Sequence, residues 1–121
     1  MSPLLDTNIV IHILRGWPAA FEEFRRYSDH SISVITWIEV MVGVEGDEAD
    51  LIRQRLRSLT LLQIDGQTAE IAVSLRRAHR IKLPDALVWA TARRHGLLLL
   101  TRNTKDFPAE DPSVRFPYTL S

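Results

Sequence analysis

Apolar residues in this chain follow two patterns that predict different elements. Short apolar runs predict strands buried in a sheet, and apolar residues three or four positions apart predict helices with one inward face. Strands are expected at residues 4–5, 31–35, 61–64, 97–101 and, as an edge strand, 114–116. Helices are expected at residues 7–14, 18 to about 27, 36 to about 43, 47 onward, 68–79 and 84–96.

The helical spacing also predicts which side chains face the core. These are two aromatic residues of the second helix, four aliphatic residues of the fourth and three apolar residues of the fifth, namely Phe21, Phe24; Leu51, Ile52, Leu56, Leu59; Ile71, Leu75 and Ala78. Strands that alternate with helices indicate a parallel sheet covered on both faces. We therefore expect a three-layer α/β/α sandwich with a central, mainly parallel sheet of four to five strands, in one domain over residues 1–121.

Three acidic residues lie where a strand is expected to give way to a helix. They are Asp6, Glu39 and Asp85. In an open parallel sheet the carboxyl ends of the strands share one edge, and ligands bind there. The pattern predicts that the three carboxylates gather at this edge, although the acids are far apart in the sequence.

Each acid also has a purely structural interpretation. Asp6 suits the N-cap of the first helix. Thr36 and Glu39 have the spacing of a capping box, and Asp85 follows Pro84 in a first helical turn, where the helix dipole favours negative charge. However, Asp85 shares the apolar side of its helix, since the residues three, four and seven positions later are apolar.

Carboxylates brought this close together require a cation. Two of them ~5 Å apart repel by about 3 kcal/mol at an effective dielectric of ~20, whereas a helix terminus contributes only ~0.3–1 kcal/mol. A site of carboxylate oxygens suits Mg²⁺ or Mn²⁺. The interpretation that fits best gives the acids both roles, as helix caps and as metal ligands.

Composition narrows the class of protein. The chain has no cysteine, so disulfides and thiolate metal sites are excluded. Its formal net charge is +0, less basic than most nucleic-acid binders, but nearly all its cations are arginines, which match phosphate geometry. High-GC coding explains the arginine bias equally well. No signal peptide or membrane-spanning run is evident, so a cytoplasmic protein is expected.

Four segments of the chain together resemble the PIN-domain ribonucleases, and most closely the toxins of VapBC-type toxin–antitoxin pairs. They are LLDTN at 4–8, ITWIEVMVG at 35–43, LPDALVWATA at 83–92 and LLLTRNTKDF at 98–107. Their order and spacing cover nearly the whole chain. The resemblance implies a PIN-like fold and a ribonuclease that depends on a divalent metal.

By this resemblance, Asp6, Glu39 and Asp85 are catalytic acids that bind the metal, supported by Asn8 and Thr101. Many relatives carry a fourth acid two residues after the threonine, where this chain has Asn103. Either Asn103 fills that role as a neutral oxygen ligand, or the later Asp106 does. We expect one tightly held ion and a second that arrives with the substrate phosphate.

The expected reaction is hydrolysis of RNA phosphodiester bonds by a metal-activated water. Asp6 and Asp85 are expected to bind the metal directly, and Glu39 either binds it or holds the water. Basic residues near the acids are expected to contact phosphates, namely Arg76, Arg77, Arg80, Lys82, Arg102 and Lys105. A solvated helix face is an equally good explanation of the group that precedes Asp85.

The resemblance also implies two protein partners. The segment 37–42 is too continuously apolar for one helix face, and a homodimer formed around it is expected. A cognate antitoxin is expected to wrap the first helices near Trp17, Phe21 and Phe24. For any one of these aromatic residues, ordinary core packing is the simpler interpretation.

Two other classes of protein remain open. One is a PIN-like scaffold that binds RNA without cutting it, because Asn103 replaces an acid. The other, less favoured, is a phospho-receiver domain with Asp65 as the phosphoacceptor, although a receiver needs paired acids after its first strand and this chain has only Asp6 there.

Overall fold

The computed structural model describes residues 2–118 and forms one five-stranded sheet. Its strands are β1 (Pro3–Leu5), β2 (Ser31–Ser33), β3 (Thr60–Leu62), β4 (Leu98–Leu100) and β5 (Val114–Arg115). The strand order is β3-β2-β1-β4-β5, and every neighbouring pair is parallel. The predicted parallel α/β fold is confirmed, with β1 at the centre.

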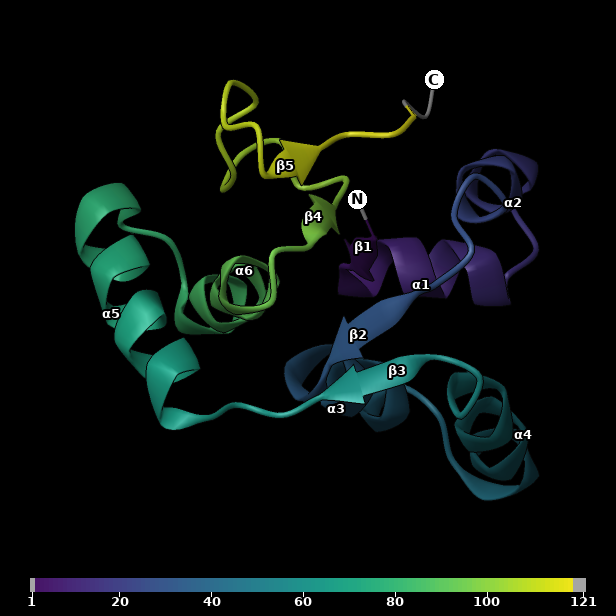
Figure 1. Cartoon of the computed structure of the whole chain (residues 1–121). Coiled ribbons are helices and arrows are strands. Elements are labelled where there is room, and N and C mark those ends of the chain that lie inside the picture. The colour runs from purple at the N-terminus through teal and green to yellow at the C-terminus, as the bar shows by residue number, and fades with distance from the viewer. Residues whose placement is uncertain (1, 119–121) are drawn as a thin grey trace.

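Six helices flank the sheet in the described part of the chain. They are α1 (Thr7–Leu14), α2 (Pro18–Phe24), α3 (Val34–Val42), α4 (Gly46–Leu56), α5 (Gly66–His79) and α6 (Leu83–Arg94). Helices α5 and α6 lie on one side of the sheet, and α1, α2 and α4 lie on the other (Figure 1). This arrangement is the predicted three-layer sandwich.

The central strands bury both of their faces. Leu4 and Leu99 belong to the apolar cluster under α5 and α6, whereas Leu5 and Leu100 belong to the cluster under α1 and α4. Successive side chains of a strand point to opposite faces, so neighbouring leucines fill the two clusters alternately. A continuous run of leucines therefore becomes β4, as predicted.

Several boundaries differ from the prediction because serine and aspartate cap helices early. The Ser33 hydroxyl accepts a hydrogen bond from the Ile35 backbone N–H at 3.1 Å, which ends β2 and starts α3 at Val34. Thr36 therefore lies inside α3, and the capping box predicted with Glu39 is wrong. Asp65 caps α5 in the same way, so α5 starts at Gly66, two residues before the expected start.

Three of the predicted inward positions are exposed. Phe21 is 37% exposed and Leu51 56% exposed, and Ala78 in the last turn of α5 is also exposed. Helix α4 buries Ile52 and Leu56 only, because it lies at the margin of the sandwich. On α2 the buried position next to Ala20 is taken by a charged residue, Glu23.

Glu23 is 4% exposed and joins α2 to the edge strand β5. Arg115 donates to both carboxylate oxygens, at 2.8 and 3.1 Å, and the Tyr27 hydroxyl donates at 2.8 Å. Burial alone would raise the pKa of Glu23, but the hydrogen bonds from Arg115 and Tyr27 hold it below its ordinary value. This ion pair links residues 92 positions apart, and no local pattern in the sequence points to it.

No helix in residues 2–118 is long and apolar enough to cross a membrane.

The Glu23 ion pair predicts a contrast between two arginines. Arg115→Met leaves a buried carboxylate without its main partner and should lower the free energy of unfolding by about 2–4 kcal/mol. Arg26 contacts the same carboxylate at 3.3 Å but has 58% of its side chain exposed, so Arg26→Met should cost less than about 1 kcal/mol. Urea unfolding at pH 7.5 measures both.

The pH dependence of this contrast follows from the lowered pKa of Glu23. A carboxylate with a lowered pKa stabilises the fold above its unfolded-state pKa, and that contribution is lost as the pH falls through the folded-state value. The cost of Arg115→Met should therefore shrink below about pH 4.5. Equal costs for the two variants at pH 7.5 would contradict the structural role of Arg115.

Candidate active site

Asp6 lies at the carboxyl end of the central strand and is 5% exposed. One carboxylate oxygen accepts from the Thr7 backbone N–H at 2.8 Å, so Asp6 is the N-cap of α1. The other accepts from the Thr101 hydroxyl at 2.6 Å, at the end of β4. Burial raises the pKa of Asp6 despite these two hydrogen bonds, and the charge of Glu39 raises it further.

Glu39 lies one turn into α3 and is exposed. Its carboxylate accepts from the Thr7 hydroxyl at 2.6 Å, and that hydroxyl lies 3.3 Å from the hydroxyl of the buried Thr36. Thr7 therefore connects Asp6 to Glu39. The sequence analysis gave Thr7 no role, because its bond to Glu39 joins residues 32 positions apart.

Asp85 lies in the first turn of α6, and the prediction that a strand precedes it is wrong. Helix α5 comes before it, and the chain turns at Arg80, whose backbone is left-handed with φ 54°. Asp85 is half-buried, while Val88 and Trp89 on the same helix side are buried. Its position on the inward side of α6 agrees with the prediction.

The pKa of Asp85 is raised to about 6. Burial is the largest cause, followed by the negative charges of Asp6, Asp106 and Glu39, and Lys82 acts in the opposite direction. The other three carboxyl groups therefore lie within electrostatic reach of Asp85. Lys82 does not neutralise their repulsion of the Asp85 carboxylate.

Asn103 and Asp106 form one unit rather than two alternatives. The Asn103 side-chain amide donates to the Asp106 carboxylate at 2.8 Å, and its oxygen accepts from the Asp106 backbone N–H at 3.3 Å. The backbone N–H of Asn103 donates to the Thr101 hydroxyl at 3.0 Å. Asn103 therefore orients Asp106, and Asp106 is one of the three carboxylates that act on Asp85.

Asn8 supports the same edge from α1. Its side-chain oxygen accepts from the Arg102 backbone N–H at 3.1 Å and holds the segment after β4 against the helix. Asn8 and Thr101, the two predicted supporting residues, thus both join the first helix to the end of β4. The Thr101 hydroxyl is hydrogen-bonded to Asp6, and the Asn8 side-chain oxygen to the Arg102 backbone N–H.

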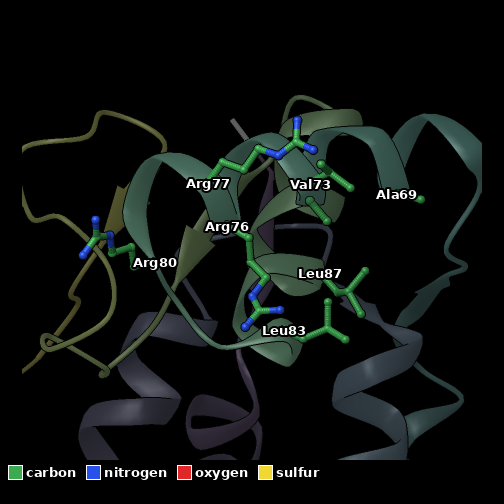
Figure 2. Close-up of a pocket in the computed structure, with 8 residues that line it drawn as sticks. Ala69, Val73, Arg76, Arg77, Arg80, Leu83 and Leu87 are labelled. Atoms are coloured by element: carbon green, nitrogen blue, oxygen red, sulfur yellow. The ribbon is translucent and has the colours of Figure 1, made fainter.

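The predicted RNA-binding cations are spread over two regions. Arg76 and Arg77 line a hollow of about 650 Å³ between α5 and α6, whose floor is aliphatic, and Arg80 borders it. Their guanidinium groups point in different directions, and the Arg76 Nε–H donates to the Ile81 carbonyl at 3.1 Å (Figure 2). Lys82 at the start of α6 is the cation of this group that acts on Asp85.

The donor set has the right chemistry for a hard divalent cation. All of the groups that converge are carboxylate, hydroxyl or amide oxygens, and the repulsion on Asp85 favours a cation among them. Within residues 2–118, however, no three acidic or histidine side chains lie close enough to hold one ion as they stand. Magnesium commonly takes one or two carboxylates and keeps several waters, which this arrangement allows.

Comparison with known proteins identifies the class. The chain matches the PIN domain family over residues 4–109 and belongs to it. It is 30% identical to the toxin FitB of Neisseria gonorrhoeae, over 95% of this chain and 97% of the relative. It is 28% identical to the tRNA(fMet)-specific endonuclease VapC of Shigella flexneri, over 86% of this chain and 88% of the relative.

A solved structure, a toxin–antitoxin complex from Klebsiella pneumoniae, contains a chain with the same fold. The TM-score is 0.91 and the sequence identity 41%, over 98% of this chain and 99% of that chain. The receiver-domain alternative is wrong, since the strand order β3-β2-β1-β4-β5 differs from the 2-1-3-4-5 order of that fold. Asp65, its supposed phosphoacceptor, caps α5 instead.

The repulsion on Asp85 predicts a stability gain on neutralisation. Because the folded-state pKa is raised to about 6, ionised Asp85 destabilises the metal-free fold above that pH, and the cost vanishes below the ordinary value of 3.8. In EDTA at pH 7.5, Asp85→Asn should raise the free energy of unfolding by on the order of 1 kcal/mol, because screening reduces the effect at a half-exposed group. Thermal unfolding at pH 7.5 and pH 4 measures the difference.

Mn²⁺ should stabilise the wild type and have little effect on Asp85→Asn. Asp65→Asn is the matched control. The Asp65 carboxylate accepts hydrogen bonds from Thr68 and does not destabilise the fold, so neutralising it should give no gain in stability. A marked loss of metal-free stability in Asp85→Asn would instead assign Asp85 a capping or packing role.

Proposed function

We propose that this protein is a divalent-metal-dependent ribonuclease and the toxin of a toxin–antitoxin pair. The observation that carries the proposal is the uncompensated acidic edge, where Asp6 is buried and the pKa of Asp85 is raised by burial and by three neighbouring carboxyl groups. Relatives named as an endonuclease and a ribonuclease support it. Such a protein acts in the cytoplasm, where its RNA substrate is.

Asp6 and Asp85 would hold the cation, a magnesium or manganese ion, with Glu39 and Asp106 at its margin. A bound divalent ion lowers the pKa of a coordinated water and offsets charge on the phosphate. Thr101 and Thr7 keep the Asp6 carboxylate oriented through hydrogen bonds of 2.6 and 2.8 Å. Asn103 does the same for Asp106, so it is a positioning residue.

The substrate phosphates would meet cations on both sides of the acids. Lys82 flanks Asp85 at the start of α6, and Arg102 and Lys105 flank the Asn103 turn. The Arg76 side chain donates a hydrogen bond to the Ile81 carbonyl. We therefore propose that Arg76 stabilises the turn between α5 and α6 rather than binding RNA.

A second candidate is a PIN-like scaffold that binds RNA without turnover. The absence of a ready three-ligand cluster in residues 2–118 is the observation that favours it. Against it, four carboxyl groups interact at this edge, and Asp106 supplies the acid that Asn103 lacks. The nuclease therefore remains the better proposal.

An antitoxin would bind across α1, α2 and α4. Phe21 and Phe24 line an apolar hollow of about 210 Å³ between these helices, and Leu14 and Leu56 lie beside them. Apolar hollows with an aromatic rim suit the anchor residues of a partner helix. The similar chain in the toxin–antitoxin complex from Klebsiella pneumoniae supports a partner of this kind.

A homodimer would form around α3. Ile38 is 47% exposed and Val42 80% exposed on this helix, whereas Val40 and Thr36 are buried. Exposed aliphatic residues that lie on one helix, one turn apart, mark an interaction surface.

The nuclease proposal predicts metal-dependent cleavage of RNA. Purified protein free of antitoxin should cut a mixed single-stranded RNA pool in Mg²⁺ or Mn²⁺ and not in EDTA. Asp6→Asn should lose at least about 100-fold of the rate, since it removes a metal ligand while keeping the side-chain size. Gel analysis of labelled RNA measures this.

Asp65→Asn, a substitution of another helix-capping aspartate, should cleave like the wild type. Wild type that is inert with every metal while still binding RNA would favour the scaffold.

The dimer proposal predicts a change of mass in solution. A double variant, Ile38→Asp with Val42→Asp, should elute as a monomer where the wild type elutes as a dimer, because it places charge on the apolar surface of α3. Leu51→Asp, at an exposed leucine of α4, should leave the mass unchanged. Light scattering after size exclusion measures the mass, and a monomeric wild type would exclude the dimer.

A further inference from the structure

A row of flat side chains runs along one side of α1. It starts near the acidic edge and leads away from it. Arg102 lies over the Tyr118 ring, 5.2 Å from its centroid, and donates to the Tyr118 carbonyl. The Tyr118 hydroxyl and His12 Nδ1 are 2.8 Å apart. His12 stacks on Trp17 with ring centroids 3.9 Å apart and planes 14° apart. We call Arg102, Tyr118, His12 and Trp17 the α1 flank.

The α1 flank begins at the active-site edge. The Arg102 backbone is bound to Asn8, and Arg102 directly follows Thr101, whose hydroxyl donates to Asp6. Asn8 and His12 are four residues apart on α1, so they share one side of the helix. His12 lies six residues after Asp6, on the order of 9 Å along α1 by the helix rise, which is room for about two to three bases at the ~3.4 Å spacing of a stacked strand.

Core packing does not account for Trp17, whereas Tyr118 packs against the apolar cluster under α1 and α4. Trp17 is half-buried, yet it belongs to neither apolar cluster in the described part of the chain. It is the N-cap residue of α2 but makes no side-chain capping bond. A large aromatic ring that neither fills the core nor caps its helix is available for a ligand.

The charge of the α1 flank suits a polyanion. Burial and the nearby charges of Arg102 and Arg15 lower the pKa of His12, so its imidazole is a neutral, flat ring at neutral pH. Arg102 and Arg15 supply positive charge near the His12 ring. Proteins that bind single-stranded nucleic acids combine a basic track for the backbone with aromatic rings on which bases stack.

We propose that the α1 flank is a stacking platform for single-stranded RNA, which holds the nucleotides on one side of the phosphate that lies at the acids. The proposal rests on the ribonuclease function and adds a substrate form to it. RNA in a duplex has its bases stacked on each other and cannot use the platform. The apolar hollow lined by Phe21 and Phe24 is separate and better suited to a protein helix.

Binding in EDTA tests the platform without cleavage. The probe is a fluorescein-labelled 12-nucleotide oligouridylate, and the readout is fluorescence anisotropy. Trp17→Leu and Tyr118→Leu should each weaken binding about tenfold, since one stacked base is lost. Phe21→Leu is the matched control, because it removes an exposed aromatic ring of the neighbouring helix that lies outside the flank. Thermal unfolding checks that all three variants are folded.

Two further readouts separate stacking from general electrostatic attraction. RNA should quench tryptophan fluorescence in the wild type and in Trp37→Leu, but much less in Trp17→Leu. An RNA duplex of the same length should bind the wild type and Trp17→Leu alike. Equal oligouridylate affinity of Trp17→Leu and Phe21→Leu, or no binding by the wild type, would overturn the proposal.

The outcomes also separate this proposal from the nuclease. If Trp17→Leu weakens binding but no metal supports cleavage by the wild type, the platform stands and the nuclease fails. If Asp6-dependent cleavage occurs and Trp17→Leu leaves KM unchanged, the nuclease stands and the platform fails. If Trp17→Leu keeps its RNA affinity and loses a co-expressed antitoxin, the flank is a protein contact and the proposal is overturned.

Discussion

The burial of one carboxylate, Asp6, at the end of the central strand is the constraint on which the rest of the site depends. A buried charge must be hydrogen-bonded or paired, and here Thr7 and Thr101 supply the hydrogen bonds but no positive charge. Glu39 and Asp85, the other two predicted acids of the site, therefore lie in the negative potential of Asp6. The raised pKa of Asp85 is the measurable consequence, and it leaves the edge in need of a cation.

The fold can hold several carboxylates at one edge of the sheet because its stability comes from two apolar clusters and from a buried ion pair. Alternate leucines of β1 and β4 fill separate apolar clusters on the two faces of the sheet. The Glu23–Arg115 ion pair fixes the edge strand to α2, on the other side of the sandwich from α5 and α6. Repulsion that would unfold a small sheet is tolerated by a sandwich with two cores.

The features that could be predicted from the sequence are those that a short stretch of residues determines. The strand expected at 97–101 is observed as β4 (Leu98–Leu100), and Asp6 is found because it ends a short apolar strand. The strand expected before Asp85 is absent because α5 leads into α6 through a left-handed turn at Arg80, a residue type with no special tendency for that backbone. The Glu23–Arg115 pair and the bond from Thr7 to Glu39 join distant segments, so no spacing rule reveals them.

Asn103 shows how the polar neighbours shape the acidic edge. An aspartate at this position would add a fifth charge within hydrogen-bonding distance of Asp106, and two carboxylates ~5 Å apart already cost about 3 kcal/mol at an effective dielectric of ~20. The neutral amide instead donates to Asp106 at 2.8 Å and takes up one of its lone pairs. Asn103 thus orients Asp106 without adding another charge to the edge. It limits the repulsion among the acids that a bound cation would offset.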